Sequence, residues 1–156
     1  MTTTWVLVAD GAKARLFEMA ARDGQWVEID CLVNPEGRTR GRDLTTERRP
    51  MVDESRTPLR HALEPHTPPR EKSAERFVRA LREVLEQGRA HGRYERLVLV
   101  APSHFLGLLR SGLGDPLCEY VTAEIRRDLT ALPAVEVRAR LPGRLFREPH
   151  AGHEIQ

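Results

Sequence analysis

Arginine is concentrated in one short stretch of this sequence. Residues 38–49 hold five arginines and only two acids, which gives the stretch a local charge of +3. These arginines are Arg38, Arg40, Arg42, Arg48 and Arg49. Guanidinium groups bind phosphate oxygens through paired hydrogen bonds, and a basic segment along a phosphate backbone releases its counterions. The stretch is therefore a candidate site for an anion or a nucleic acid, and a merely solvated charge cluster is the alternative.

Polar residues that follow two apolar runs form a second candidate site. Asp10 comes directly after Trp5–Ala9, where ribonuclease H-like nucleases place a metal-binding carboxylate. Two-metal chemistry needs several carboxylates, and Ser103 and His104, which follow the other run, supply none. We interpret Asp10 as a turn residue, Ser103 as a helix cap and His104 as a surface residue. The alternative is a pocket at the strand edge, including an anion site at a helix N-terminus.

The histidines and cysteines do not have the spacing of a metal site. The histidines considered are His61, His66, His150 and His153. No cysteine or second pair is spaced with them to complete four ligands. Cys31 and Cys118 lie in or beside apolar patterns, so we expect small buried hydrophobes. A glycine-rich phosphate loop is also absent, and we expect no metal and no cofactor.

Length and composition are those of one ordinary globular domain. The chain has 156 residues, of which 40% are hydrophobic and 31% charged. Its longest apolar runs are far shorter than the roughly 20 residues of a membrane span. The first residues lack the basic region of a secretory signal. We therefore expect a cytoplasmic protein.

Hydrophobic periodicity predicts a definite order of strands and helices. Three strands come first, at Trp5–Ala9, Ala14–Met19 and Trp26–Val33, with Asp-Gly turns between them. A helix follows from about Pro69 to Ala90, ended by Gly92, and then a buried strand at Arg96–Ala101. The remaining expected elements are a helix starting at Ser103, a short helix capped by Asp115, a strand over 120–127 and a helix from Thr130 to about Leu141. For residues 120–127 a helix is the alternative.

This order predicts a single α/β domain over residues 1–141. Three meandering strands and a helical crossover to a parallel strand give a five-stranded mixed sheet of order 3-2-1-4-5, as in ribonuclease H-like sheets, with flanking helices. Residues 34–71, rich in arginine and proline, are expected to form a long loop, and residues 142–156 a loose C-terminal tail.

Several motifs resemble those of a bacterial family. They are Trp5–Gly11 with Ala14–Phe17, Arg96–Pro102, Phe105–Arg110 and Asp128–Pro133. They resemble the family named "protein required for attachment to host cells". The layout is also similar to the central domain of archaeal and eukaryotic peptide-release factors and of the Pelota group. The release-factor resemblance implies a Gly-Gly-Gln tripeptide after the third strand, but residues 34–71 contain no glutamine.

The expected function is therefore binding without peptidyl-tRNA hydrolysis or other catalysis. We expect a module of the host-attachment family that contacts RNA, the ribosome or a protein partner through its basic loop. One alternative is a hydrolase or metal-dependent nuclease that uses Asp10 and the Ser103–His104 strand edge. Another is an interaction protein that acts as a homo-oligomer.

Overall fold

The computed structural model of the chain describes residues 2–20, 24–36 and 69–146. Its elements, in chain order, are β1 (Thr3–Ala9), β2 (Lys13–Ala20), β3 (Gln25–Val33), α3 (Pro69–Ala90), β4 (Arg96–Ala101), α4 (Ser103–Gly112), α5 (Asp115–Cys118), β5 (Val121–Arg126), α6 (Ala134–Ala139) and the 3-10 helix η1 (Gly143–Phe146). The strands form a five-stranded sheet of order β3-β2-β1-β4-β5. The predicted fold class and strand order are confirmed.

The sheet has an antiparallel half and a parallel half. β1 pairs antiparallel with β2, and β2 with β3, because each connection is a short turn. β4 pairs parallel with β1 and with β5. α3 lies between β3 and β4 in the chain, and α4 and α5 lie between β4 and β5, as parallel pairing of later strands requires a crossover. After α3 the chain returns to the middle of the sheet, where β4 lies beside β1.

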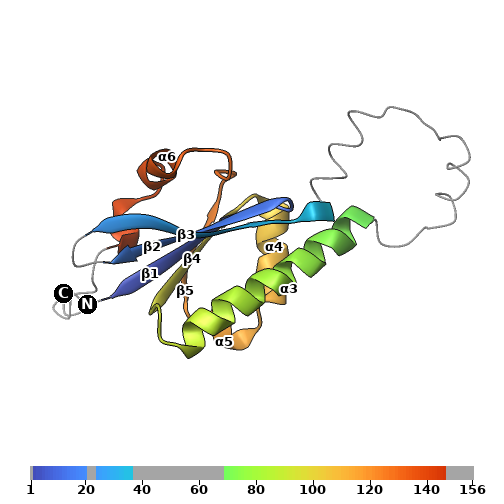
Figure 1. Ribbon diagram of the computed structural model, residues 1–156, viewed down its shortest axis with the longest axis horizontal. Helices are drawn as coiled ribbons and strands as arrows, with labels where there is room; N and C mark the ends of the chain where they lie inside the picture. The colour runs from blue at the N-terminus through green and yellow to red at the C-terminus, as the bar shows by residue number, and fades with distance from the viewer. Residues whose placement is uncertain (1, 21–23, 37–68, 147–156) are drawn as a thin grey trace, which may run out of the picture.

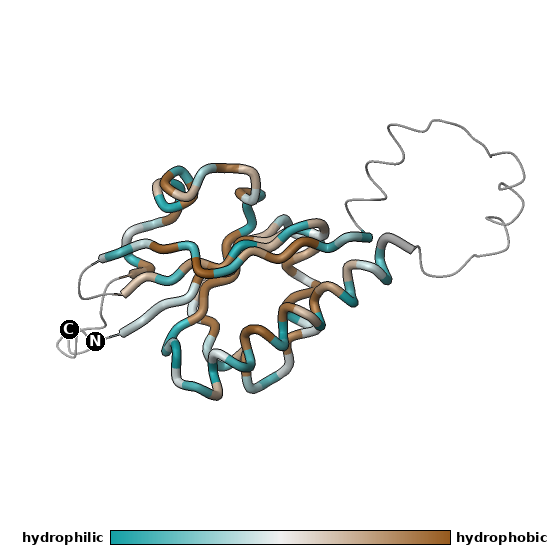
Figure 2. The backbone as a smooth tube through the Cα atoms, in the orientation of Figure 1, coloured by the Kyte–Doolittle hydropathy of each residue, from teal (hydrophilic) through white to brown (hydrophobic). Residues whose placement is uncertain are grey.

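Helices cover both faces of the sheet. α3, α4 and α5 lie against one face, and α6 lies against the other (Figure 1). β1 and β4 are in the middle, and their apolar side chains alternate between two buried clusters. Leu7 and Leu99 point to the first cluster, while Val6 and Val98 point to the second. Hydrophobic residues accordingly follow the central strands and the sheet-facing side of α3 (Figure 2).

α3 has the predicted bounds and ends at a left-handed glycine. Phe77, Leu81 and Leu85 recur on one side of the helix and are buried against the sheet. After Ala90 the chain turns at Gly92, whose φ of 65° favours glycine. The N–H of Arg93 donates to the carbonyl of Gly88 at 2.8 Å, and the N–H of Gly92 donates to that of Arg89 at 3.0 Å. This pattern is a Schellman motif, and it fixes where Arg93 lies.

The C-terminal elements differ from their predictions. The helix expected from Thr130 to Leu141 covers only Ala134–Ala139. Leu132 precedes a proline, which disfavours helical backbone there, and Arg15 binds the carbonyls of Thr130 and Leu132. The loose tail expected from residue 142 is wrong for residues 143–146, which form η1 with Phe146 buried beside Trp26.

Three smaller predictions are also corrected. Asp115 does not cap α5, because Gly114 occupies the N-cap position. Cys31 is exposed, because it lies on the edge strand β3. The loop predicted over 34–71 is wrong at its two ends, because Asn34 is buried and α3 begins at Pro69. The rest of that prediction, residues 37–68, lies outside the described residues. No helix in the described part of the chain is long and apolar enough to cross a membrane.

Candidate functional site

The three parallel strands end at one edge of the sheet. Val8 pairs with Val100, and Ala101 pairs with Arg126, so the chain leaves β1, β4 and β5 side by side. Ligands of open α/β sheets often bind outside these carboxyl ends. Asp10, Ser103 and His104 therefore share this edge.

Asp10 uses both of its carboxylate oxygens to hold the fold together. Oδ1 accepts the backbone N–H groups of Ala12 at 2.8 Å and Lys13 at 2.9 Å, which closes the turn between β1 and β2. Oδ2 accepts the hydroxyl of Thr130 at 3.0 Å. Thr130 is buried and follows β5 by a few residues. Asp10 thus joins the β1–β2 turn to the segment after β5.

Ser103 and His104 are exposed at the start of α4. Pro102 occupies the N-cap position and no side chain caps the helix, so the prediction of Ser103 as a cap is wrong. Within residues 2–20, 24–36 and 69–146, neither Ser103 nor His104 hydrogen-bonds to another residue through its side chain. Ser103 and His104 therefore lie at the same edge of the sheet as Asp10, but no hydrogen bond among the described residues joins them to it.

The Asp10→Ala variant tests how much the hydrogen bonds of the Asp10 carboxylate stabilise the fold. We expect a loss of about 1–2 kcal/mol in the free energy of unfolding, because two turn amides and the Thr130 hydroxyl lose their acceptor. Urea unfolding followed by circular dichroism measures it. Asp115→Ala is the matched control, since Asp115 is exposed and caps nothing. A magnesium-dependent nuclease activity that the parent shows and Asp10→Ala abolishes would instead favour the enzymatic alternative.

The other residues considered in the sequence lie outside the described residues. These are the five arginines at 38, 40, 42, 48 and 49, and the histidines at 61, 66, 150 and 153. Among the residues that the structure describes, no cluster of three or more His, Cys, Asp or Glu side chains could hold a metal ion.

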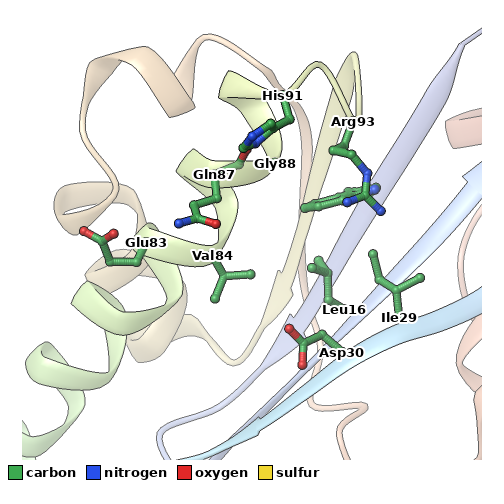
Figure 3. Close-up of a pocket in the computed structure, with 10 residues that line it drawn as sticks. Leu16, Ile29, Asp30, Glu83, Val84, Gln87, Gly88, His91 and Arg93 are labelled. Atoms are coloured by element: carbon green, nitrogen blue, oxygen red, sulfur yellow. The ribbon is translucent and has the colours of Figure 1, made fainter.

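A groove that sequence reasoning missed lies between α3 and the β2–β3 half of the sheet. It has a volume of about 610 Å³. Trp5, Leu16 and Ile29 line it from the sheet, and Val84 and Gly88 from α3 (Figure 3). The sequence predicts strands at Trp5, Leu16 and Ile29 and a helix at Val84 and Gly88, and nothing in these patterns indicates a site. Among the described residues, α3 is the helix that lies beside β2 and β3 on this face, and the groove lies next to it.

A β-bulge in β3 shapes the floor of the groove. Leu16 pairs with Asp30 but the next residue, Phe17, pairs with Glu28, so Ile29 is an extra residue in the strand. Successive strand residues normally point to opposite faces. Here Ile29 and Asp30 both line the groove. The bulge thus adds an apolar side chain and a carboxylate at the same place.

Charged side chains of both signs border the groove. His91 and Arg93 lie near the end of α3, and Asp30 lies at the opposite end (Figure 3). Glu83 lies on α3. The guanidinium of Arg93 sits over the Trp5 ring, 5.8 Å from its centroid. The Nδ1 atom of His91 is 2.8 Å from the carbonyl of Gln87, which orients the ring.

The fold places the chain among α/β proteins with a five-stranded mixed sheet. Comparison with known families then identifies it: a model described as "Protein required for attachment to host cells" matches residues 5–141. The chain belongs to this family. The similarity to release factors stays a prediction.

Other comparisons add little. No curated protein matches the chain. A solved structure of the Aquifex aeolicus Ppx/GppA phosphatase, type II variant, is similar over 80% of this chain and 35% of that one, with 12% identity and a TM-score of 0.39. The chain thus spans about a third of that phosphatase. A likeness this remote is too weak to carry over an activity or a site.

Proposed function

We propose that this chain is a non-catalytic binding module that contacts RNA, including ribosomal RNA, through the arginines of residues 38–49. The observation that carries the proposal is the local charge of +3 in a stretch of five arginines. Membership of the host-attachment family supports an attachment-related role. The module would serve that role by binding, and the phenotype named in the family description would then be an indirect result of this contact.

The contacts between the end of β3 and the start of α3 support the proposal that the folded domain holds the arginine segment in place for binding. Asn34 is buried, and its amide donates to the Ser73 hydroxyl at 3.0 Å and to the Gly11 carbonyl at 2.9 Å. Glu36 pairs with Arg76 of α3 at 2.6 Å. The end of β3 and the start of α3 are therefore joined. Binding segments are commonly held in this way by a rigid scaffold.

The carboxylate at the sheet edge supports the absence of catalysis. A metal-binding or general-base carboxylate needs oxygens that are free for the ion or the proton. Both oxygens of Asp10 accept hydrogen bonds from within the fold. Ser103 and His104 are adjacent residues without a mutual hydrogen bond.

Co-sedimentation with purified ribosomes tests the RNA contact. Replacing all five arginines with alanine should abolish salt-sensitive co-sedimentation. If each arginine contacts one phosphate, the affinity of the parent should fall about a hundredfold between ~50 and ~200 mM salt. Replacing the same five with lysine is the matched control, because it keeps the charge and should keep most of the binding.

Two results would contradict the RNA contact. One is equal binding by the parent and the alanine variant, and the other is no binding by the parent at low salt. Binding that survives ribonuclease treatment would point instead to a protein partner of the same segment.

A further inference from the structure

One residue that lines the groove beside α3, Trp5, carries a buried hydrogen-bond donor without an acceptor. The indole Nε1 of Trp5 is buried and bonds to no acceptor in the described part of the chain. Trp5 itself is only 4% exposed and lines the groove. A buried polar atom without a partner costs free energy, so such atoms in native proteins usually have an explanation. A ligand with an acceptor oxygen would supply the hydrogen-bond partner that the Trp5 Nε1–H group lacks.

Arg93 adds a positive charge at the same place. Its guanidinium lies over the Trp5 ring at 5.8 Å from the centroid, and the side chain is exposed. Among the described residues it makes no ion pair, whereas Arg76, Arg89 and Arg110 each pair with a glutamate. A free guanidinium above a ring whose N–H lacks an acceptor favours a carboxylate, sulfonate or phosphate oxygen at this end.

The floor of the groove suits a hydrocarbon body. Leu16, Ile29 and Val84 face one another across it (Figure 3). Its volume of about 610 Å³ is in the range of small-molecule sites, which are mostly apolar with a few placed polar groups.

The opposite end of the groove carries negative charge. Asp30 lies there on β3. Glu83 also lines the groove, from α3, and its side chain makes no hydrogen bond to another described residue. Two carboxylates would repel a second anionic group on a ligand. The charges of the groove therefore favour a ligand with one negative group at the Arg93 end.

Two features of β3 disfavour the pairing of an additional β-strand with its free edge. The carboxylate of Asp30 accepts the backbone N–H of Cys31 at 2.8 Å. The bulge at Ile29 also breaks the regular edge. Charged side chains and bulges are the usual means by which edge strands avoid pairing. A small molecule consequently fits this surface better than an extended peptide.

We propose that the groove binds a largely apolar organic monoanion, with its anionic group at Arg93 and Trp5 and its hydrocarbon body on Leu16, Ile29 and Val84. Arg93 selects for the negative group, and Asp30 and Glu83 select against a second one. The proposal uses none of the arginines of residues 38–49, so its failure would leave the proposed RNA contact unaffected.

Three naphthalene probes of the same shape test the site. They are naphthoate with one charge, naphthamide with none and a naphthalene dicarboxylate with two. Binding is followed by amide chemical shifts in nuclear magnetic resonance titrations of the full chain. We expect saturable shifts at Leu16, Ile29, Val84 and Gly88. Naphthoate should bind about tenfold more tightly than naphthamide, since a charged hydrogen bond is worth a factor of this order, and the dicarboxylate should bind more weakly than naphthoate.

Variants of the charged residues separate the contributions. Arg93→Gln should remove the preference for naphthoate over naphthamide, while Asp30→Asn with Glu83→Gln should relieve the discrimination against the dicarboxylate. Arg79→Gln is the matched control, because Arg79 is exposed on α3 but does not line the groove. Thermal unfolding of each variant checks that the fold is kept.

The proposal is overturned by any of three results. The first is that no groove amide shifts at millimolar probe. The second is equal binding of naphthoate and naphthamide by the parent. The third is that Arg79→Gln lowers naphthoate affinity as much as Arg93→Gln does.

Discussion

Replacing Arg15 with methionine is expected to lower the free energy of unfolding by about 3 kcal/mol, near the lower limit for removing one partner of a buried ion pair. Arg15 lies on β2 and is 8% exposed, which is rare for a charged residue. It donates to the carbonyl of Thr130 at 3.0 Å and also to that of Leu132. Its Nε and Nη2 atoms each lie 3.0 Å from a carboxylate oxygen of Glu28.

This large effect has two causes. Methionine fills a similar volume but leaves the two carbonyls without their donor, so the segment between β5 and α6 loses its attachment to the sheet. Glu28 also loses its partner, although partial exposure lets water hydrate that carboxylate. Hydrogen bonding to Glu28 raises the pKa of Arg15, so the residue stays charged in the parent over the whole accessible pH range.

Urea unfolding of Arg15→Met compared with Arg110→Met measures this effect. Arg110 pairs with Glu124 as Arg15 pairs with Glu28, but its side chain is 56% exposed. Exposed ion pairs contribute little, so Arg110→Met should change stability only slightly. Equal losses in the two variants would show that burial of Arg15 is not what makes it important.

The second large effect is expected from Gly88→Ala in α3, with a loss of about 2 kcal/mol from overpacking. An added Cβ atom would lie 2.5 Å from both Cη2 and Cζ3 of Trp5 and 3.1 Å from Cε1 of Tyr94. Neither ring can move away easily. They stack on each other with centroids 4.5 Å apart, and the Tyr94 hydroxyl donates to the Leu85 carbonyl at 2.7 Å.

Helix propensity predicts the opposite sign for this substitution. Alanine is about 1 kcal/mol more favourable than glycine inside a helix. Gly107→Ala in α4 isolates that gain, because nothing lies within 4 Å of its added Cβ. We expect thermal unfolding to show a higher Tm for Gly107→Ala and a lower Tm for Gly88→Ala. A rise in both would mean that α3 or the two rings move apart at no cost in stability.

Much of the fold could be predicted from local patterns. The runs at Trp5–Ala9 and Arg96–Ala101 are apolar throughout because both faces of these strands are covered, and that pattern is readable without coordinates. The strand order followed from the crossover rule. What could not be predicted depends on distant contacts. The carbonyl of Leu132 binds Arg15 from far along the chain, and the bulge at Ile29 exists only in the pairing of β3 with β2.

The candidate sites divide in the same way. Asp10, Ser103 and His104 could be found because polar residues next to apolar runs lie at strand ends. The hydrogen bond from Thr130 that engages Asp10 crosses between distant segments and has no local signal. The groove escaped prediction because Trp5, Leu16 and Val84 have the pattern of core residues. Arg93 follows a helix-ending glycine, a position that predicts only a turn.

Capture of RNA from cells that naturally make this protein tests the central claim most directly. The immobilised parent chain and the variant with alanine at positions 38, 40, 42, 48 and 49 are compared, each with and without ribonuclease. The account predicts that RNA elutes with salt from the parent, that ribonuclease removes the co-eluting proteins, and that the variant retains neither. Equal recovery of RNA from parent and variant, or none from the parent, would contradict it.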